Sequence, residues 1–185
     1  KKIFMIKALI FDLDGVLVET KDIHYQALNL AINKICKIKE AISYKDHLNR
    51  YDGLPTSTKL KILFKGKLSQ KKAKLINQEK QKITSKLIKK NIKYNKKIYH
   101  IFKSFHEKGY LICVASNAVK LTVNSCLSIL KIKKFIKFSL SNNDVKNSKP
   151  HPEIYIKLFL KLGLSPKNIL VIEDSYYGLK AARES

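Results

Sequence analysis

Four short strand-like runs recur along this chain, the first of them continuously apolar, and helix-like stretches separate the later ones. The runs cover residues 8–11, 110–115, 135–140 and 168–172, and the helical patterns cover 119–130 and 152–162. An apolar run without polar alternation is typical of a strand that is buried on both faces of a parallel sheet. The alternation of such strands with helices predicts an α/β fold with right-handed crossovers and a Rossmann-like, three-layer parallel sheet core.

The block between the first two predicted strands is too long for a single crossover helix. From about residue 43 to 106 its pattern is helical and very polar, and it contains no strand-like alternation. It predicts an inserted helical cap domain at 18–94, with a discontinuous core domain at 1–17 and 95–185. The last predicted helix starts near Ser175 and the sequence stops at Ser185, so we expect either an unusually short protein or a missing C-terminal piece.

The first helix of the predicted cap begins after Thr20, a residue type that can cap a helix. Its apolar side chains recur at helical spacing, which predicts a face buried in the cap. We expect that face to carry Ile23, Ala27, Leu28, Leu30 and Ala31.

The formal net charge of +24 admits two interpretations. A strongly basic protein can bind nucleic acid or anionic membranes, or its lysines can lie spread over solvated faces. Arg50 and Arg183 are the only arginines, and lysines occur in nearly every segment rather than in one stripe. Because specific nucleic-acid sites rely on arginine for bidentate contacts to bases, we expect no specific nucleic-acid partner, only weak and salt-sensitive binding to polyanions.

The three cysteines, Cys36, Cys113 and Cys126, show neither metal-ligand spacing nor a C-x-x-C pair. This usage is typical of a reducing compartment, and no apolar run approaches the length of a membrane span. We therefore expect a cytoplasmic protein with no membrane partner, as a monomer or weak homo-oligomer.

Polar side chains follow each of the four predicted strands. In open parallel sheets ligands bind beyond the carboxyl ends of the strands, so we expect these side chains to share one site. Residues two apart on an extended chain point the same way, which lets both acids after the first strand face that site. The set consists of Asp12 and Asp14, Ser116 and Asn117, Lys149, and Glu173 and Asp174.

This set of residue types suits phosphoryl transfer. The reaction needs an in-line nucleophile, a cation against the phosphoryl oxygens and donors that hold those oxygens. Clustered carboxylates repel one another unless a hard cation lies among them, and Mg²⁺ prefers oxygen ligands. The sequence therefore predicts a magnesium cofactor, whereas no His/Cys ligand set indicates zinc.

Four motifs in this order resemble the haloacid dehalogenase (HAD) superfamily, in the branch that includes β-phosphoglucomutase and phosphoglycolate phosphatase. They span almost the whole chain, and the cap matches only loosely. A lone D-x-D is weak evidence, but four motifs on four predicted strand ends are specific. The motifs are Phe11-Asp12-Leu13-Asp14-Gly15-Val16-Leu17-Val18-Glu19-Thr20, Ala115-Ser116-Asn117, Lys149-Pro150-His151-Pro152-Glu153-Ile154-Tyr155 and Ile172-Glu173-Asp174-Ser175 with Gly178 and Ala181-Ala182.

The resemblance implies a role for each residue of the set. Asp12 corresponds to the nucleophile that becomes phosphorylated, and Asp14 to the acid/base. Ser116 and Lys149 correspond to groups that hold the phosphoryl oxygens, and Asn117 to one that orients substrate or phosphate. The implied magnesium ligands are Asp12, Asp14 through its carbonyl, Glu173 and Asp174. Gly15 would permit a tight turn, and Gly178 close helix packing.

Three cap residues also correspond to substrate-binding positions of this branch, namely His24, Gly53 and Thr56. His24 follows the first motif, although a histidine on a helix face is more often structural. The stretch 50–56 resembles the cap loop that reaches the active site, and a plain helix–helix turn is compatible with the same residues. Phosphomutases of this branch usually place an arginine in that loop, whereas this chain has Thr56, with Arg50 a few residues away.

The predicted function is hydrolysis of a small phosphorylated metabolite by an HAD-like phosphatase. The substrate would be a phosphoglycolate- or sugar-phosphate-like phosphomonoester, and the reaction would use Mg²⁺ and an aspartyl-phosphate. One alternative is a sugar phosphomutase with the same chemistry. Another is a basic nucleic-acid-binding or scaffolding protein with a decayed core, against which the intact acids of all four motifs argue.

Overall fold

The computed structural model describes residues 5–51 and 53–185, which divide into two compact units. The core unit consists of the described residues up to Glu19 together with Ile92–Ser185, and the helical unit is Thr20–Asn91. Each unit buries its own cluster of apolar side chains. An α/β core with a helical cap inserted after the first strand is therefore confirmed.

The core unit is built on one parallel sheet of four strands. These are β1 (Ala8–Phe11), β2 (Leu111–Ala115), β3 (Ile136–Leu140) and β4 (Ile169–Ile172), in the order β3-β2-β1-β4. Phe11 at the end of β1 lies beside Val114 and Ile172. This register brings the residues that follow β1, β2 and β4 to the same edge of the sheet.

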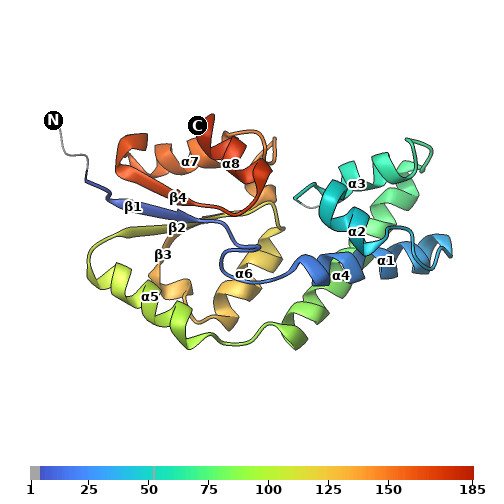
Figure 1. The fold of residues 1–185 in the computed structure, drawn as a ribbon, viewed down its shortest axis with the longest axis horizontal. Helices are drawn as coiled ribbons and strands as arrows, with labels where there is room; N and C mark the ends of the chain where they lie inside the picture. The colour runs from blue at the N-terminus through green and yellow to red at the C-terminus, as the bar shows by residue number, and fades with distance from the viewer. Residues whose placement is uncertain (1–4, 52) are drawn as a thin grey trace. The chain divides into compact units, whose positions relative to one another are not determined.

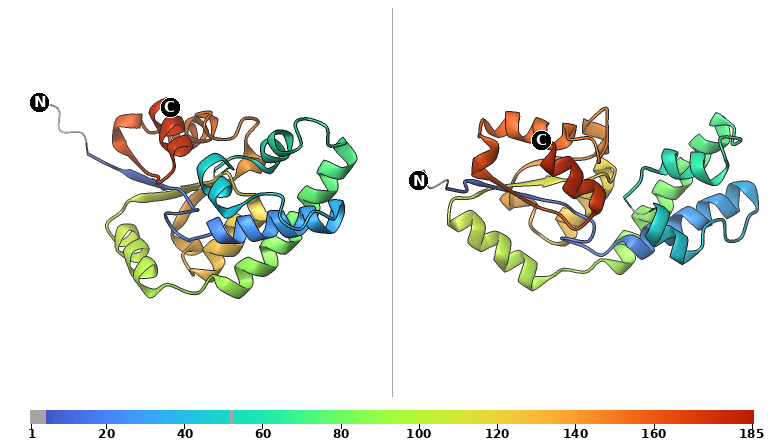
Figure 2. Two further views of the ribbon diagram at one scale, coloured as in Figure 1. Left: turned by 45° about the vertical axis from the view of Figure 1, so that its right-hand side comes forward. Right: turned by 45° about the horizontal axis from the view of Figure 1, so that its top comes forward.

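Helices cover both faces of this sheet. Figure 1 shows α5 (Lys96–Glu107) and α6 (Lys120–Ile129) on one face, and α7 (Glu153–Leu162) and α8 (Tyr176–Arg183) on the other; the views in Figure 2 agree. Apolar side chains of the strands pack against α7 and α8, and the cluster includes Ile10, Cys113 and Ile154. The three predicted layers are confirmed.

The three later strands begin one residue after their predicted starts. The amides of Phe135 and Asn168 donate to Ile132 and Ser165, at 2.9 Å each, within the 3₁₀ turns η2 (Lys133–Phe135) and η4 (Pro166–Asn168). The Tyr110 amide similarly donates back to Phe105 at 3.1 Å. An amide that is used in a local turn is not available to the strand ladder, so each of these predicted strands was one residue too long at its start.

The helical unit contains α1 (Lys21–Cys36), α2 (Tyr44–Asp46), α3 (Thr56–Leu63) and α4 (Gln70–Asn91), with a π-helical turn η1 (His47–Tyr51). Helices α1 and α4 form the main packing interface of this unit. Side chains from three helices meet in its apolar cluster, among them Ile32, Leu60 and Ile76. Among the described residues, no helix has both the length and the apolar character needed to cross a bilayer.

One expectation for α1 is wrong and a second is met only in part, because Thr20 occupies the N-cap position without a side-chain cap. Leu30 is 51% exposed, while the neighbouring Asn29 is buried and its amide holds the backbone of Ala41 and Ile42. Thr20 precedes the helix with φ −123° and ψ 2°, and its side chain makes no capping hydrogen bond. A capping side chain normally accompanies extended φ/ψ angles, which Thr20 does not adopt.

Candidate active site

Asp12 directly follows β1 and is held at the edge of the sheet by its backbone. Its amide donates to the Ile172 carbonyl at 2.9 Å, which continues the pairing of β1 with β4. The chain then turns sharply at Gly15, whose φ is +90° and whose amide donates to the Val18 carbonyl at 2.8 Å. This turn leaves Asp12 buried and Asp14 half-buried on the same side of the core unit.

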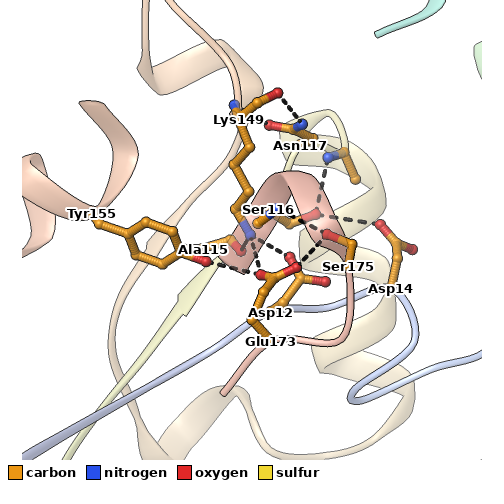
Figure 3. Close-up of polar contacts among 11 residues, drawn as sticks. Asp12, Asp14, Ala115, Ser116, Asn117, Lys149, Tyr155, Glu173 and Ser175 are labelled. Atoms are coloured by element: carbon orange, nitrogen blue, oxygen red, sulfur yellow. Dashed lines mark hydrogen bonds and ion pairs between the residues drawn. The ribbon is translucent and has the colours of Figure 1, made fainter. Parts of the chain in front are cut away.

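Lys149 crosses the same edge from the loop that precedes α7. Its ammonium donates to Asp12 Oδ1 at 2.6 Å, to the Ala115 carbonyl at 2.8 Å and to Glu173 Oε2 at 2.8 Å (Figure 3). An ammonium group carries three N–H donors, so each of them has an acceptor. Because the Lys149 side chain is only 3% exposed, this is a buried cation shared by two carboxylates.

Asn117 fixes the backbone of Lys149. Its side-chain amide donates to the Lys149 carbonyl at 3.1 Å, and its Oδ1 accepts from the Lys149 amide at 3.0 Å. The Lys149–Pro150 peptide bond is cis. The predicted amide residue therefore holds the loop that carries the cation.

Ser116 connects β2 to Asp14 of the first motif. Its hydroxyl is buried, lies 3.4 Å from Asp14 Oδ2 and accepts from the Ala118 amide at 2.9 Å (Figure 3). The Ser116 amide donates to the Leu140 carbonyl at 3.0 Å. The end of the interior strand β2 thus presents a buried hydroxyl beside Asp14.

Glu173 and Asp174 follow β4 and complete an acidic group. Carboxylate oxygens of Asp12, Glu173 and Asp174 all lie within 4.8 Å of one another. Two glycines make room for these acids, because a Cβ on Gly15 would overlap the Asp174 carboxylate and a Cβ on Gly178 would overlap that of Glu173. The close helix packing expected from Gly178 is thus packing against a carboxylate.

Burial dominates the electrostatics of the site. Desolvation raises the pKa of Asp12 from 3.8 to about 7; the Lys149 charge opposes this shift, and the charges of Glu173 and Asp14 add to it. Burial works against the charged form of Lys149 as well, but the charges of Asp12, Tyr155 and Glu173 raise its pKa above the ordinary value. One buried ammonium therefore does not fully compensate the neighbouring carboxylates.

These properties fit a hard divalent cation. The three acids offer oxygen ligands only, which is the donor set that Mg²⁺ prefers. A bound dication would also favour the ionised form of Asp12 that burial disfavours. The donor chemistry and the crowded carboxylates both agree with the predicted metal.

The structure brings together the set predicted at the strand ends. His24, Gly53 and Thr56 all belong to the helical unit. The Nδ1 atom of His24, on α1, lies 3.5 Å from Lys80 Nζ, and Gly53 (φ +72°) lies in the turn before α3, which Thr56 begins. Asp52 of the predicted cap loop lies outside the described residues.

Sequence reasoning assigned no role to two hydroxyl groups that contact Glu173. The Tyr155 hydroxyl donates to Glu173 Oε2 at 2.9 Å, and the Ser175 hydroxyl donates to Oε1 at 2.7 Å (Figure 3). Both residues lie inside quoted motifs, Tyr155 six positions after Lys149 and Ser175 two after Glu173. Their place inside those motifs indicates that they lie near the site, but only the fold shows that both contact the same carboxylate.

Comparison with known proteins gives a consistent family. The model described as haloacid dehalogenase-like hydrolase matches residues 9–185. A relative named phosphorylated carbohydrates phosphatase, from Thermotoga maritima, is 28% identical over 97% of this chain and 81% of its own length.

Two solved structures share the fold. CbbY from Rhodobacter sphaeroides, solved as a mutant with xylulose-(1,5)bisphosphate, has a TM-score of 0.86 at 19% identity, covering 97% of this chain and 82% of that one. The β-phosphoglucomutase from Clostridium difficile has a TM-score of 0.82 at 27% identity, covering 97% and 81%.

Proposed function

Since the chain belongs to the haloacid dehalogenase-like hydrolase family, we propose that it hydrolyses a small phosphomonoester with magnesium, through an aspartyl-phosphate formed on Asp12. One observation carries this proposal most strongly. A buried carboxylate at the carboxyl edge of a parallel sheet is paired with a buried ammonium at 2.6 Å, beside two further acids. A buried nucleophile that is paired with a cation next to a hard-metal ligand set suits phosphoryl transfer.

In the first step an Asp12 carboxylate oxygen attacks phosphorus while the bond from phosphorus to the ester oxygen breaks. Asp14 gives a proton to the departing oxygen, so the product leaves as an alcohol. The positive charge of Lys149 and the hydroxyl of Ser116 stabilise the phosphoryl oxygens, whose charge is spread in the transition state. Asn117 acts indirectly, by holding the Lys149 backbone.

In the second step water attacks the phosphorus of the aspartyl-phosphate and Asp14 takes up the proton of that water. The bond from phosphorus to the Asp12 oxygen breaks, which releases inorganic phosphate and restores the Asp12 carboxylate. The 3.4 Å contact between Ser116 and Asp14 supports this role, because it keeps Asp14 on the side of the phosphoryl-binding groups.

The carboxylates of Asp12, Glu173 and Asp174, with Asp14 through its carbonyl, would hold the magnesium ion. Such an ion supplies positive charge against the phosphoryl oxygens and favours the ionised nucleophile. The close approach of Asp174 to Gly15 supports this assignment, since it places the acid of the fourth motif against the loop of the first.

The names of relatives support a substrate class. A phosphatase named for phosphorylated carbohydrates and a fold neighbour solved with a sugar bisphosphate support a small sugar-phosphate-like ester. His24, Gly53 and Thr56 of the helical cap are the proposed substrate contacts. Thr56 in place of an arginine favours transfer to water over transfer to a second hydroxyl, although the fold neighbours include a phosphomutase.

We also propose that the protein works in the reducing cytoplasm, without a specific nucleic-acid partner. Cys36, Cys113 and Cys126 are free thiols, which such a compartment preserves.

The test is the release of phosphate from p-nitrophenyl phosphate with and without Mg²⁺. We expect Asp12→Asn to lower kcat by roughly a thousandfold or more, because it removes the attacking group. Glu107→Gln, which removes an exposed acid from α5 in the same core unit, is the matched control and should retain wild-type rates. Equal rates for wild type and Asp12→Asn would refute the assignment of the nucleophile, and a rate independent of Mg²⁺ would refute the metal.

A further inference from the structure

Tyr155 is a fully buried residue of α7 that touches the charged groups of the site. Its hydroxyl donates to Glu173 Oε2 at 2.9 Å, and the Lys149 ammonium lies 5.0 Å from the centroid of its ring. The rest of its surroundings are apolar, since it belongs to the core cluster with Ile154 and Leu158. Burial raises the pKa of this tyrosine above its ordinary value, so the hydroxyl keeps its proton and acts as a donor.

Glu173 and Asp12 compete for one ammonium group. Lys149 Nζ is 2.6 Å from Asp12 Oδ1 and 2.8 Å from Glu173 Oε2. The position of the cation therefore depends on how firmly each carboxylate is held and how much of its charge is satisfied by other donors.

The Tyr155 hydroxyl and the Lys149 ammonium share the same oxygen of Glu173. A second donor on Oε2 satisfies part of the negative charge that would otherwise draw the ammonium away from Asp12. The ring face, at cation–π distance, also attracts the ammonium and so helps to hold it in place. Both contacts favour the position in which Lys149 lies on the Asp12 carboxylate.

We propose that Tyr155 is a positioning residue for phosphoryl transfer, which holds Glu173 and Lys149 so that the ammonium stays aligned on Asp12. It acts through these two residues and does not touch the substrate. This role rests on the proposed function. It extends the site to a side chain of the apolar core. If Tyr155 only filled space, phenylalanine would replace it without kinetic consequence.

Tyr155→Phe is the variant that separates these possibilities, because it keeps the ring and removes only the hydroxyl. The matched control is Tyr99→Phe, which removes a hydroxyl from α5 of the same unit, where the ring packs on Phe135. For both variants and wild type, kcat and KM would be measured for Mg²⁺-dependent hydrolysis of p-nitrophenyl phosphate, and thermal unfolding would be followed in parallel.

We expect Tyr155→Phe to lower kcat roughly tenfold and to leave KM within about twofold, as for other groups that orient the residues in contact with the substrate. Tyr99→Phe should match wild type. A wild-type kcat in Tyr155→Phe would overturn the positioning role and leave the proposed function intact, and so would a loss explained by the unfolded fraction at the assay temperature. Absence of Mg²⁺-dependent hydrolysis in folded wild type would overturn the proposed function and this role with it.

Discussion

At the scale of single residues, the absence of a Cβ atom at Gly15 makes room for an acid of the proposed metal site. Asp174 lies so close to this glycine that a Cβ would overlap its carboxylate. The backbone also needs glycine here, since φ is +90°. The motif predicts a glycine for the turn, whereas the approach of Asp174 to it depends on the pairing of β1 with β4 and is visible only in the fold.

Gly15→Ala should therefore disturb the site beyond the cost of its backbone strain. Gly109→Ala is the matched control, because Gly109 has a similar φ of +82° but open space where the Cβ would lie. Each substitution should cost roughly 1 kcal/mol or more of stability. Only Gly15→Ala should also weaken the apparent Mg²⁺ affinity, on the order of tenfold, because it displaces a proposed ligand.

The measurement is a magnesium titration of phosphate release for both variants, with urea unfolding alongside. Equal Mg²⁺ dependence in the two variants would show that Asp174 tolerates displacement, or is not a ligand.

At the scale of elements, the start of α8 serves both the helix and the acid cluster. Ser175 is its N-cap; the Gly178 amide donates to its hydroxyl oxygen at 3.0 Å, while the hydroxyl itself donates to Glu173 at 2.7 Å. A hydroxyl can donate and accept at once, so this one side chain both caps α8 and orients the Glu173 carboxylate. The sequence pattern predicted a helix start near Ser175, and the structure confirms it.

Ser175→Ala should lower both stability and activity, and Asn95→Ala should lower stability alone. Asn95 caps α5 in the same unit, where its side chain accepts from Lys97 and Ile98 amides. Loss of either cap should cost about 1 kcal/mol in the free energy of unfolding. Only Ser175→Ala should slow phosphate release, severalfold, because Glu173 loses a donor. A slowing of the same size in Asn95→Ala would assign both effects to stability.

Helix α1 differs from its predicted burial pattern at Asn29 and Leu30. Helical spacing from Ile23 and Ala27 predicted that Leu30 is buried, but its side chain is exposed. Asn29 is buried instead, because its amide satisfies backbone groups of Ala41 and Ile42. A buried polar side chain is stable where hydrogen bonds within the protein replace those it made to water. The partners of Asn29 lie twelve and thirteen residues further along the chain, outside the pattern of the helix itself.

At the scale of the whole molecule, two units with separate apolar clusters share one chain. The cluster of the core unit includes Ile10 and Cys113, and that of the helical unit includes Ile32 and Ile76. Charges buried in one unit should therefore affect the stability of that unit first. Asp12 provides a direct test, because its pKa in the folded protein lies far above that of an unfolded chain.

Without metal, the core unit should lose stability as the pH rises from about 4 to about 7. In this range folded Asp12, with a pKa of about 7, holds a proton that the unfolded chain, with a pKa of 3.8, releases. The folded state then binds more protons, so the contribution is fully present below about pH 4 and is lost as the pH rises through 7. The expected loss is a few kcal/mol.

Amide hydrogen exchange of β1, corrected for the intrinsic effect of pH, measures this loss, and α4 of the helical unit is the internal reference. Asp12→Asn should remove the pH dependence in β1. A β1 protection that rises over this range would contradict the assigned shift of Asp12.

The sequence by itself determined the fold class, the order of the strands along the chain and the residue types at the site. These follow from local information, because buried parallel strands are short apolar runs and motif residues keep fixed distances from strand ends. Only the tertiary structure decided which groups meet. Lys149 donates to Asp12, which lies 137 positions earlier in the chain. The hydroxyls of Tyr155 and Ser175 both donate to Glu173. The missing Cβ of Gly15 leaves space for the Asp174 carboxylate. Such contacts depend on strand pairing and side-chain direction in three dimensions, which no pattern along one chain records.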